Sequence, residues 1–293
     1  PTCRGRAVTA QPCSTASVEA GESLQGTAPE SVQTWFLLEH AEPWAPKALQ
    51  SEGIAGPVRE RLTQWLHEVP RSRLQLLRRP GRSGKRPLFA VVTAGPQGRV
   101  VRRLELDELM QLSELELGDV PPAEQEAPLC LVCVHGRRDR CCALHGAAFY
   151  RAVQGEGAEV WQTSHLGGHR FAACALWLPD GLMYGRLRAE HASDFVAAHR
   201  ERRIGDLRHF RGTCAYDRPS QAAEIMLRQR TGEDRIDRLH WVCTDSETDQ
   251  SWRVRFASDA NEYELRLAME TLDAARSPSC GAAPEPITRF VEL

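Results

Sequence analysis

The sequence has almost no lysine, no long apolar run and hardly any net charge, and each absence excludes a class of protein. Only two of its 37 basic residues are lysines, Lys47 and Lys85, and the formal charge at pH 7 is -2. Such a chain has no global field that would steer it to nucleic acid or to an anionic membrane. No window approaches the ~20 consecutive apolar residues that a membrane helix needs, and residues 1–30 lack the apolar stretch of a secretory signal. We therefore expect a cytoplasmic protein that binds neither nucleic acid nor membrane.

Hydrophobic periodicity predicts a mixed α+β/α/β chain in four parts. Residues 1–30 show no period and are expected to form a mobile N-terminal segment, anchored near Cys13. The other three parts are an α+β N-terminal lobe, a central domain and a small α+β C-terminal lobe, at residues 31–126, 127–205 and 206–293. The C-terminal lobe is expected to carry one helix, at 221–229, and strands at 239–243, 252–256, 263–267 and 287–291.

The elements of the first two ordered parts follow from the same patterns. In the N-terminal lobe we expect strands at 34–39, 73–77, 88–93 and 99–104 and helices at 58–67 and 104–112. In the central domain we expect strands at 128–134, 160–162, 171–178 and 182–185 and helices at 142–153 and 190–202. Their order contains β-α-β-β-α, which is typical of a thioredoxin-like core.

Cysteine is the residue type that the chain has in excess, with ten in all. In a cytoplasmic protein, cysteines are more often metal ligands or small buried residues than disulfides. Four of them fall within thirteen residues and are interleaved with two histidines: Cys130, Cys133, His135, Cys141, Cys142 and His145. The chemistry of the protein is therefore expected at this cluster.

A redox dithiol formed by Cys130 and Cys133 is the first interpretation of the cluster. Side chains three residues apart on a strand point to opposite faces of the sheet, so these two thiols should not meet. A reactive C-x-x-C motif belongs instead at the start of a helix, where the helix dipole lowers a thiol pKa. Cys130 is therefore expected to be a small core residue.

A Rieske-like site is the second interpretation. Cys133 with His135, and Cys142 with His145, repeat the C-x-H and C-x-x-H ligand pairs of such sites. Rieske proteins, however, bring the two pairs from separate loops with a much longer insertion between them. The pairs are kept here as the alternative ligand set.

A third interpretation combines Cys133, at the end of a strand, and Cys142, at the start of a helix, with His165 and His169. Eight residues separate the two cysteines, enough for a loop whose ends approach one metal ion. The histidines flank Gly167 and Gly168, and two adjacent glycines let backbone pass close to a cofactor.

The motifs together carry a resemblance to a known family. They are Cys133-Val-His-Gly-Arg-Arg-Asp-Arg-Cys-Cys142, then Ser164-His-Leu-Gly-Gly-His-Arg-Phe-Ala172, then Leu178-Pro-Asp-Gly and Tyr184-Gly-Arg186. This pattern resembles the sucrase/ferredoxin-like family, whose members are similar to thioredoxin-like ferredoxins. The resemblance implies a [2Fe-2S] cluster held by Cys133, Cys142, His165 and His169, with Cys141 as an adjacent thiol that competes with Cys142 for the ligand role.

This ligand set predicts electron transfer at a comparatively high potential. Two Fe³⁺, two sulfides, two thiolates and two neutral imidazoles sum to zero formal charge, so adding an electron is easier than at an all-cysteine site. A ligand imidazole can still lose its second proton, which predicts proton-coupled electron transfer and a potential that falls as pH rises. Arg137, Arg138 and Arg170 are expected to stabilise the added electron and to orient a redox partner protein, as donor or acceptor, with acidic character.

Two other function classes remain open. A structural zinc protein would use the same two cysteines and two histidines, an ordinary tetrahedral ligand set. A thiol oxidoreductase would use Cys141 or Cys142 at the start of the helix. No Gly-x-Ser-x-Gly motif supports a hydrolase, and we expect a non-enzymatic electron carrier.

Overall fold

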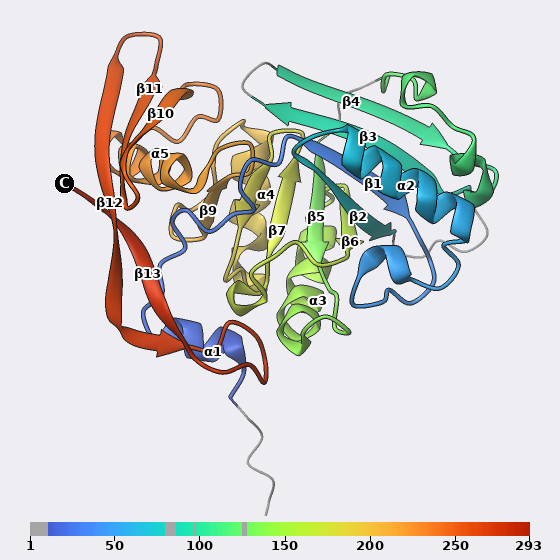
Figure 1. Cartoon of the computed structure of the whole chain (residues 1–293), viewed down its shortest axis with the longest axis horizontal. Coiled ribbons are helices and arrows are strands. Elements are labelled where there is room, and N and C mark those ends of the chain that lie inside the picture. Colours follow the sequence, from blue (N-terminus) through green and yellow to red (C-terminus); the bar gives the residue numbers. More distant parts are fainter. Residues whose placement is uncertain (1–10, 80–85, 96–97, 125–127) are drawn as a thin grey trace, which may run out of the picture.

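The computed structural model describes residues 11–79, 86–95, 98–124 and 128–293, which fold around one large mixed sheet (Figure 1). Within these residues, nine strands pair in the order β4-β3-β1-β2-β6-β5-β7-β8-β9, and four others form a second sheet in the order β10-β11-β12-β13. The mixed α/β class predicted from the sequence is confirmed. None of the helices described is long and apolar enough to cross a membrane.

The first four strands and the helix α2 form one end of the large sheet. Their bounds are β1 Thr34–Glu39, α2 Gly56–Glu68, β2 Ser72–Arg78, β3 Leu88–Gly95 and β4 Gly98–Glu105. β1 is buried along its whole length because its alternate side chains pack into two different hydrophobic clusters. α2 buries Val58, Leu62 and Trp65, one stripe at helical spacing, as the sequence predicted.

The predicted helix at 104–112 is wrong. β4 continues to Glu105, and only a short 3-10 turn, Leu109–Ser113, follows it. Leu106 and Leu112 are both buried in the cluster that α2 covers. Tertiary burial of these two leucines therefore decides the path of the segment, and a regular helix does not form.

The middle of the sheet has the predicted thioredoxin-like topology. Its elements are β5 Leu129–Cys133, α3 Arg140–Gly155, β6 Val160–Thr163, β7 Ala175–Leu178, β8 Leu182–Tyr184 and α4 Ala192–Arg200. β5 and β6 are parallel and joined through α3, while β7 is antiparallel to β5 and β8 antiparallel to β7. The strand expected from residue 171 begins only at Ala175, because His169–Phe171 form a 3-10 turn.

Two parts of the chain differ from the sequence prediction at this sheet. The segment expected to be mobile contains helix α1, Cys13–Glu19, and buries Leu24 and Ala28 in the core; residues 1–10 lie outside the described residues. The short strand β9, Phe210–Thr213, was not predicted and closes one edge of the sheet. The domain boundaries stay a prediction, and the pairing of β2 with β6 makes the sheet continuous between the N-terminal and central parts.

The C-terminal part consists of a helix packed on an antiparallel meander, as predicted. Its elements are α5 Arg218–Thr231, β10 His240–Thr248, β11 Ser251–Ala257, β12 Glu262–Arg276 and β13 Glu285–Glu292. Ala223 and Leu227 of α5 share a buried cluster with Phe256 and Leu265 of the meander. The far ends of β12 and β13 extend to α1 (Figure 1).

Gly146 of α3 lets the helix lie directly on the end of β5. A Cβ at this position would lie 2.0 Å from the carbonyl oxygen of Cys133, a backbone atom that cannot move aside freely. We expect Gly146→Ala to lower the free energy of unfolding by about 2–3 kcal/mol through overpacking. Gly155→Ala at the end of the same helix meets nothing within 4 Å and should raise stability by up to about 1 kcal/mol. Urea denaturation of both variants measures the difference, and equal stabilities would contradict it.

Candidate metal centre

Three elements of the thioredoxin-like core bring two thiols and an imidazole together. Cys133 ends β5, Cys142 lies in the first turn of α3, and His165 follows β6. The two strands are parallel neighbours, so both end at the same edge of the sheet. The candidate ligand atoms of the three residues all lie within 4.8 Å of one another, and the Cys142 Sγ is 3.8 Å from the His165 Nδ1.

His169 lies beside this group. Its ring stacks on that of His165 with centroids 4.9 Å apart. Its Nδ1 is buried, and no hydrogen-bond partner for it is found among the described residues. Its Nε2 faces the Asp139 carboxylate at 3.9 Å. A buried nitrogen without a partner costs free energy, and a histidine whose other nitrogen faces a carboxylate is the usual arrangement of a metal ligand. The residues therefore fit a metal centre.

The pKa values of the two thiols on β5, Cys133 and Cys130, shift in opposite directions. The hydrogen bond with Cys142 holds the pKa of the Cys133 thiol well below its usual range, against the effect of burial, and His165 lowers it further. Burial alone raises the pKa of the Cys130 thiol. Of the two cysteines of β5, Cys133 is therefore the one whose surroundings favour the thiolate, the form that binds metals.

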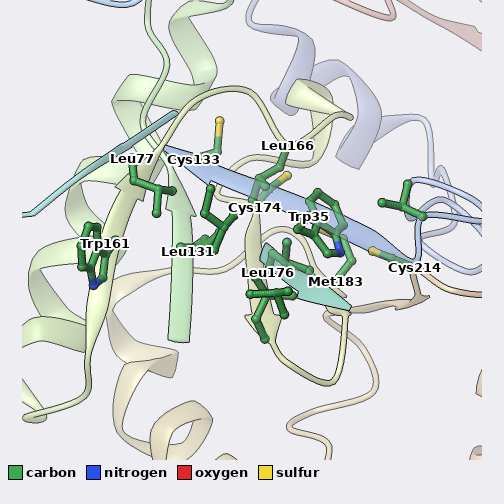
Figure 2. Packing of buried hydrophobic residues seen from close by; sticks show 14 of the residues in the cluster. Trp35, Leu77, Leu131, Cys133, Trp161, Leu166, Cys174, Leu176, Met183 and Cys214 are labelled. Carbon is green, nitrogen blue, oxygen red and sulfur yellow. The ribbon is translucent and has the colours of Figure 1, made fainter. Parts of the chain in front are cut away.

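The two cysteines of β5 also face different cores. Cys130 packs in the cluster that contains Phe149 and Trp177. Cys133 lies at the edge of the cluster on the other face, which contains Leu131 and Leu166 (Figure 2). The alternation predicted from the strand is confirmed, and a dithiol between the two is excluded by it.

His135 and His145 have other partners. The Nδ1 of His135 accepts a hydrogen bond from the backbone N–H of His165 at 3.2 Å, and its Nε2 lies 3.4 Å from the Trp44 carbonyl oxygen. The Nε2 of His145 lies 3.1 Å from the Ser14 hydroxyl. His135 therefore positions the loop that carries His165, and the ligand pairs of the Rieske-like alternative are not brought together.

Two arginines that the sequence did not single out hold the histidine loop. Arg73 of β2 donates to the carbonyl oxygens of Leu166 at 3.1 Å and of His165 at 3.4 Å. Arg211 of β9, 1% exposed, donates to the Gly167 carbonyl oxygen at 3.0 Å. No sequence signal distinguishes them, because each lies in a strand far along the chain from the loop.

Gly167 and Gly168 serve this packing. Both have positive φ, 101° and 69°, a region that favours glycine. A Cβ at Gly168 would lie 2.5 Å from the Arg211 Nη2. The sequence predicted that these glycines admit a cofactor, whereas the described contacts show that Gly168 admits the Arg211 guanidinium.

The other arginines predicted near the site divide into two kinds. Arg137 and Arg138 are exposed, and Arg138 lines a surface hollow with Lys47, Arg73 and His165. Arg170 is turned to the Glu22 carboxylate at 2.9 Å and lies over the Phe171 ring. Its charge is therefore partly neutralised, and it anchors the segment after α1.

Fold and site together define a mixed α/β protein with a thioredoxin-like core and a candidate metal centre of Cys133, Cys142 and His165 at one edge of its sheet, with His169 beside it. The chain belongs to the sucrase/ferredoxin-like family, whose sequence profile matches residues 24–212. The resemblance drawn from its motifs is thereby confirmed.

Comparisons with individual proteins add one solved structure. The chain is similar to a cysteine-to-serine variant of the thioredoxin-like [2Fe-2S] ferredoxin from Aquifex aeolicus, with 16% identity and a TM-score of 0.26, over 28% of this chain and 96% of that protein. No curated protein matches the sequence.

Proposed function

We propose that this protein is an electron carrier that holds a [2Fe-2S] cluster through Cys133, Cys142, His165 and His169. The observation that carries the proposal is that Cys133, Cys142 and His165 meet, with the His169 ring stacked on that of His165. The buried Nδ1 of His169 has no hydrogen-bond partner among the residues that the structure describes. Membership of the sucrase/ferredoxin-like family supports it. When bound, such a cluster accepts and releases one electron.

The surrounding residues favour the reduced state. Two thiolates and two neutral imidazoles leave the oxidised site formally neutral, which raises its potential relative to four thiolates. The guanidinium groups of Arg73 and Arg211 hold the loop of His165 and add positive charge where solvent screens it little. We propose a potential in the range of Rieske centres, about -150 to +300 mV. Its fall with rising pH stays a prediction.

The surface beside His165 suits an acidic redox partner. Lys47 and Arg138 line the hollow next to His165, and Arg137 is exposed on the same loop as Arg138. Complementary charge increases the rate at which two electron carriers meet. We propose that the donor or acceptor is a redox protein with an acidic surface.

Iron and sulfide analysis of protein purified without oxygen tests the function. We expect about two irons and two acid-labile sulfides per chain and a visible absorption that bleaches on reduction. Protein without iron and sulfide would refute the proposal. Zinc lost on Cys133→Ala would then identify the structural alternative, and a thiol reagent that labels native Cys142 would identify a thiol oxidoreductase.

Arg211→Met removes a buried charge without adding a polar group. We expect the potential to fall by on the order of 60 mV, the one-electron equivalent of a tenfold change in equilibrium constant. Arg208→Met is the control, because Arg208 is 85% exposed and pairs with Asp206. A potential that moves equally in both variants would show that Arg211 has no specific effect. Redox titration followed by absorbance measures both.

A further inference from the structure

A second group of thiols lies outside the proposed cluster site. Cys13 of α1, Cys141 of α3 and Cys280, after β12, come from three distant parts of the chain. Their Sγ atoms form a nearly equilateral triangle with sides of 3.6 Å (Cys13–Cys141), 3.5 Å (Cys141–Cys280) and 3.7 Å (Cys13–Cys280). Figure 1 shows α1 beside the loop between β12 and β13.

The triangle has the size of one face of a tetrahedral metal site. Zinc bound to sulfur at about 2.3 Å places neighbouring ligand sulfurs about 3.8 Å apart. Disulfide sulfurs lie about 2.05 Å apart, and all three distances here are much longer. Three thiols at such mutual distances match a mononuclear zinc thiolate in both ligand type and spacing.

Asp139 supplies a fourth donor group. Both of its carboxylate oxygens lie 3.8 Å from the Cys13 Sγ. They accept hydrogen bonds from the backbone N–H groups of Cys141 at 2.8 Å and Cys280 at 2.9 Å. The carboxylate is buried, and one ligand atom from each of the four residues lies within 4.8 Å of the others.

We propose that Cys13, Cys141, Cys280 and Asp139 bind a zinc ion that is distinct from the proposed cluster. Zinc takes both thiolate and carboxylate ligands, and its binding displaces three thiol protons to the solvent. Three thiolates, one carboxylate and Zn²⁺ carry a net charge of -2. Arg140, whose guanidinium hydrogen-bonds with Cys280, and the N-terminal end of the α3 dipole offset this charge.

The zinc site joins the two ends of the chain to the core. Cys13 belongs to the N-terminal segment, Cys280 to the C-terminal meander, and Cys141 to the helix that also carries Cys142. Asp139 faces His169 of the proposed cluster site. Zinc therefore holds the start of α3 in place beside the cluster ligands, a structural role that goes beyond electron transfer.

Metal analysis of the full chain and of single variants tests this site. We expect about one zinc per chain in the wild-type protein. In Cys13→Ser and Cys280→Ser we expect the zinc occupancy to fall by roughly tenfold or more. Iron and sulfide should remain in both variants. Cys243→Ser is the matched control, because Cys243 lies on β10 with Arg255 as its partner, and it should keep all three elements.

A zinc titration of the wild-type protein tests the site even if a variant does not fold. Stripped of zinc with a chelator and titrated with Zn²⁺ alone, the protein should take up about one equivalent and gain thermal stability. No uptake, unchanged zinc in Cys13→Ser, or a disulfide among these cysteines found by mass spectrometry would overturn the proposal. Iron and sulfide are assayed in the same samples, so loss of the proposed function is seen separately from loss of the zinc site.

Discussion

Cys133→Ala and Cys142→Ala are each expected to abolish the iron content and the visible absorption of the protein. Cys133 is the cysteine whose pKa the surrounding groups lower, and Cys142 shares its hydrogen bond and faces the His165 imidazole. Removing either leaves the cluster one thiolate short, and metal-ligand bonds supply much of the stability of such a site. We expect iron to fall from about two per chain to near zero.

Two neighbouring cysteines provide controls for this result. Cys130→Ala changes the same strand on its other face, where the thiol packs against apolar side chains. Cys141→Ala changes the residue next to Cys142. The Cys141 sulfur contacts Cys13 and Cys280 instead of the candidate cluster ligands. Both variants should keep the iron and the absorption. Retention of iron in Cys142→Ala together with its loss in Cys141→Ala would reverse the assignment of the adjacent pair.

His165→Cys and His169→Cys are expected to keep a cluster and to lower its potential by a few hundred millivolts. Each exchanges a neutral imidazole for a thiolate, and all-cysteine plant-type sites lie at about -400 mV, well below Rieske centres. Potentiometric titration with detection of the reduced cluster by electron paramagnetic resonance measures the change.

His145→Cys is the control for the histidine exchange. His145 lies on α3 and pairs with the Ser14 hydroxyl, so its replacement should leave the potential within about 60 mV of the wild-type value, the equivalent of a tenfold change for one electron. An unchanged potential in His165→Cys or His169→Cys would exclude ligation at that position. Loss of iron in the His145 variant would favour the Rieske-like ligand set.

Local pattern was sufficient where neighbouring residues decide the structure. The alternation in Leu129–Cys133 predicted that Cys130 and Cys133 face different cores, and the structure confirms it. The apolar stripe of α2 and the meander of the C-terminal part were predicted for the same reason. α1 was missed, because a helix of seven residues with no acidic residue in its first turn and no basic residue in its last carries almost no local signal.

For the candidate cluster site too, the sequence predicted the residues that lie close together in the chain but not the contacts between distant parts. Cys133 and Cys142 are separated by one loop, and His165 and His169 by one turn, so their short spacings were visible as motifs. The sequence did not show that the Nε2 of His169 faces Asp139, or that its Nδ1 has no partner among the described residues. It also did not show that Arg73 and Arg211 hold the loop. Arg73 and Arg211 approach the loop only when strands distant in sequence pair in one sheet.

The sequence by itself determined the family and the candidate ligands of the cluster, because the motifs that carry them are short and contiguous. Only the tertiary structure brought Cys13 and Cys280 to Cys141, across separations of 128 and 139 residues. In the sequence Cys13 and Cys280 stand apart from the cysteine cluster that contains Cys141. Their meeting depends on the long strand β12, which returns the C-terminal part of the chain to α1, and a contact of that range leaves no periodic trace in the residues between.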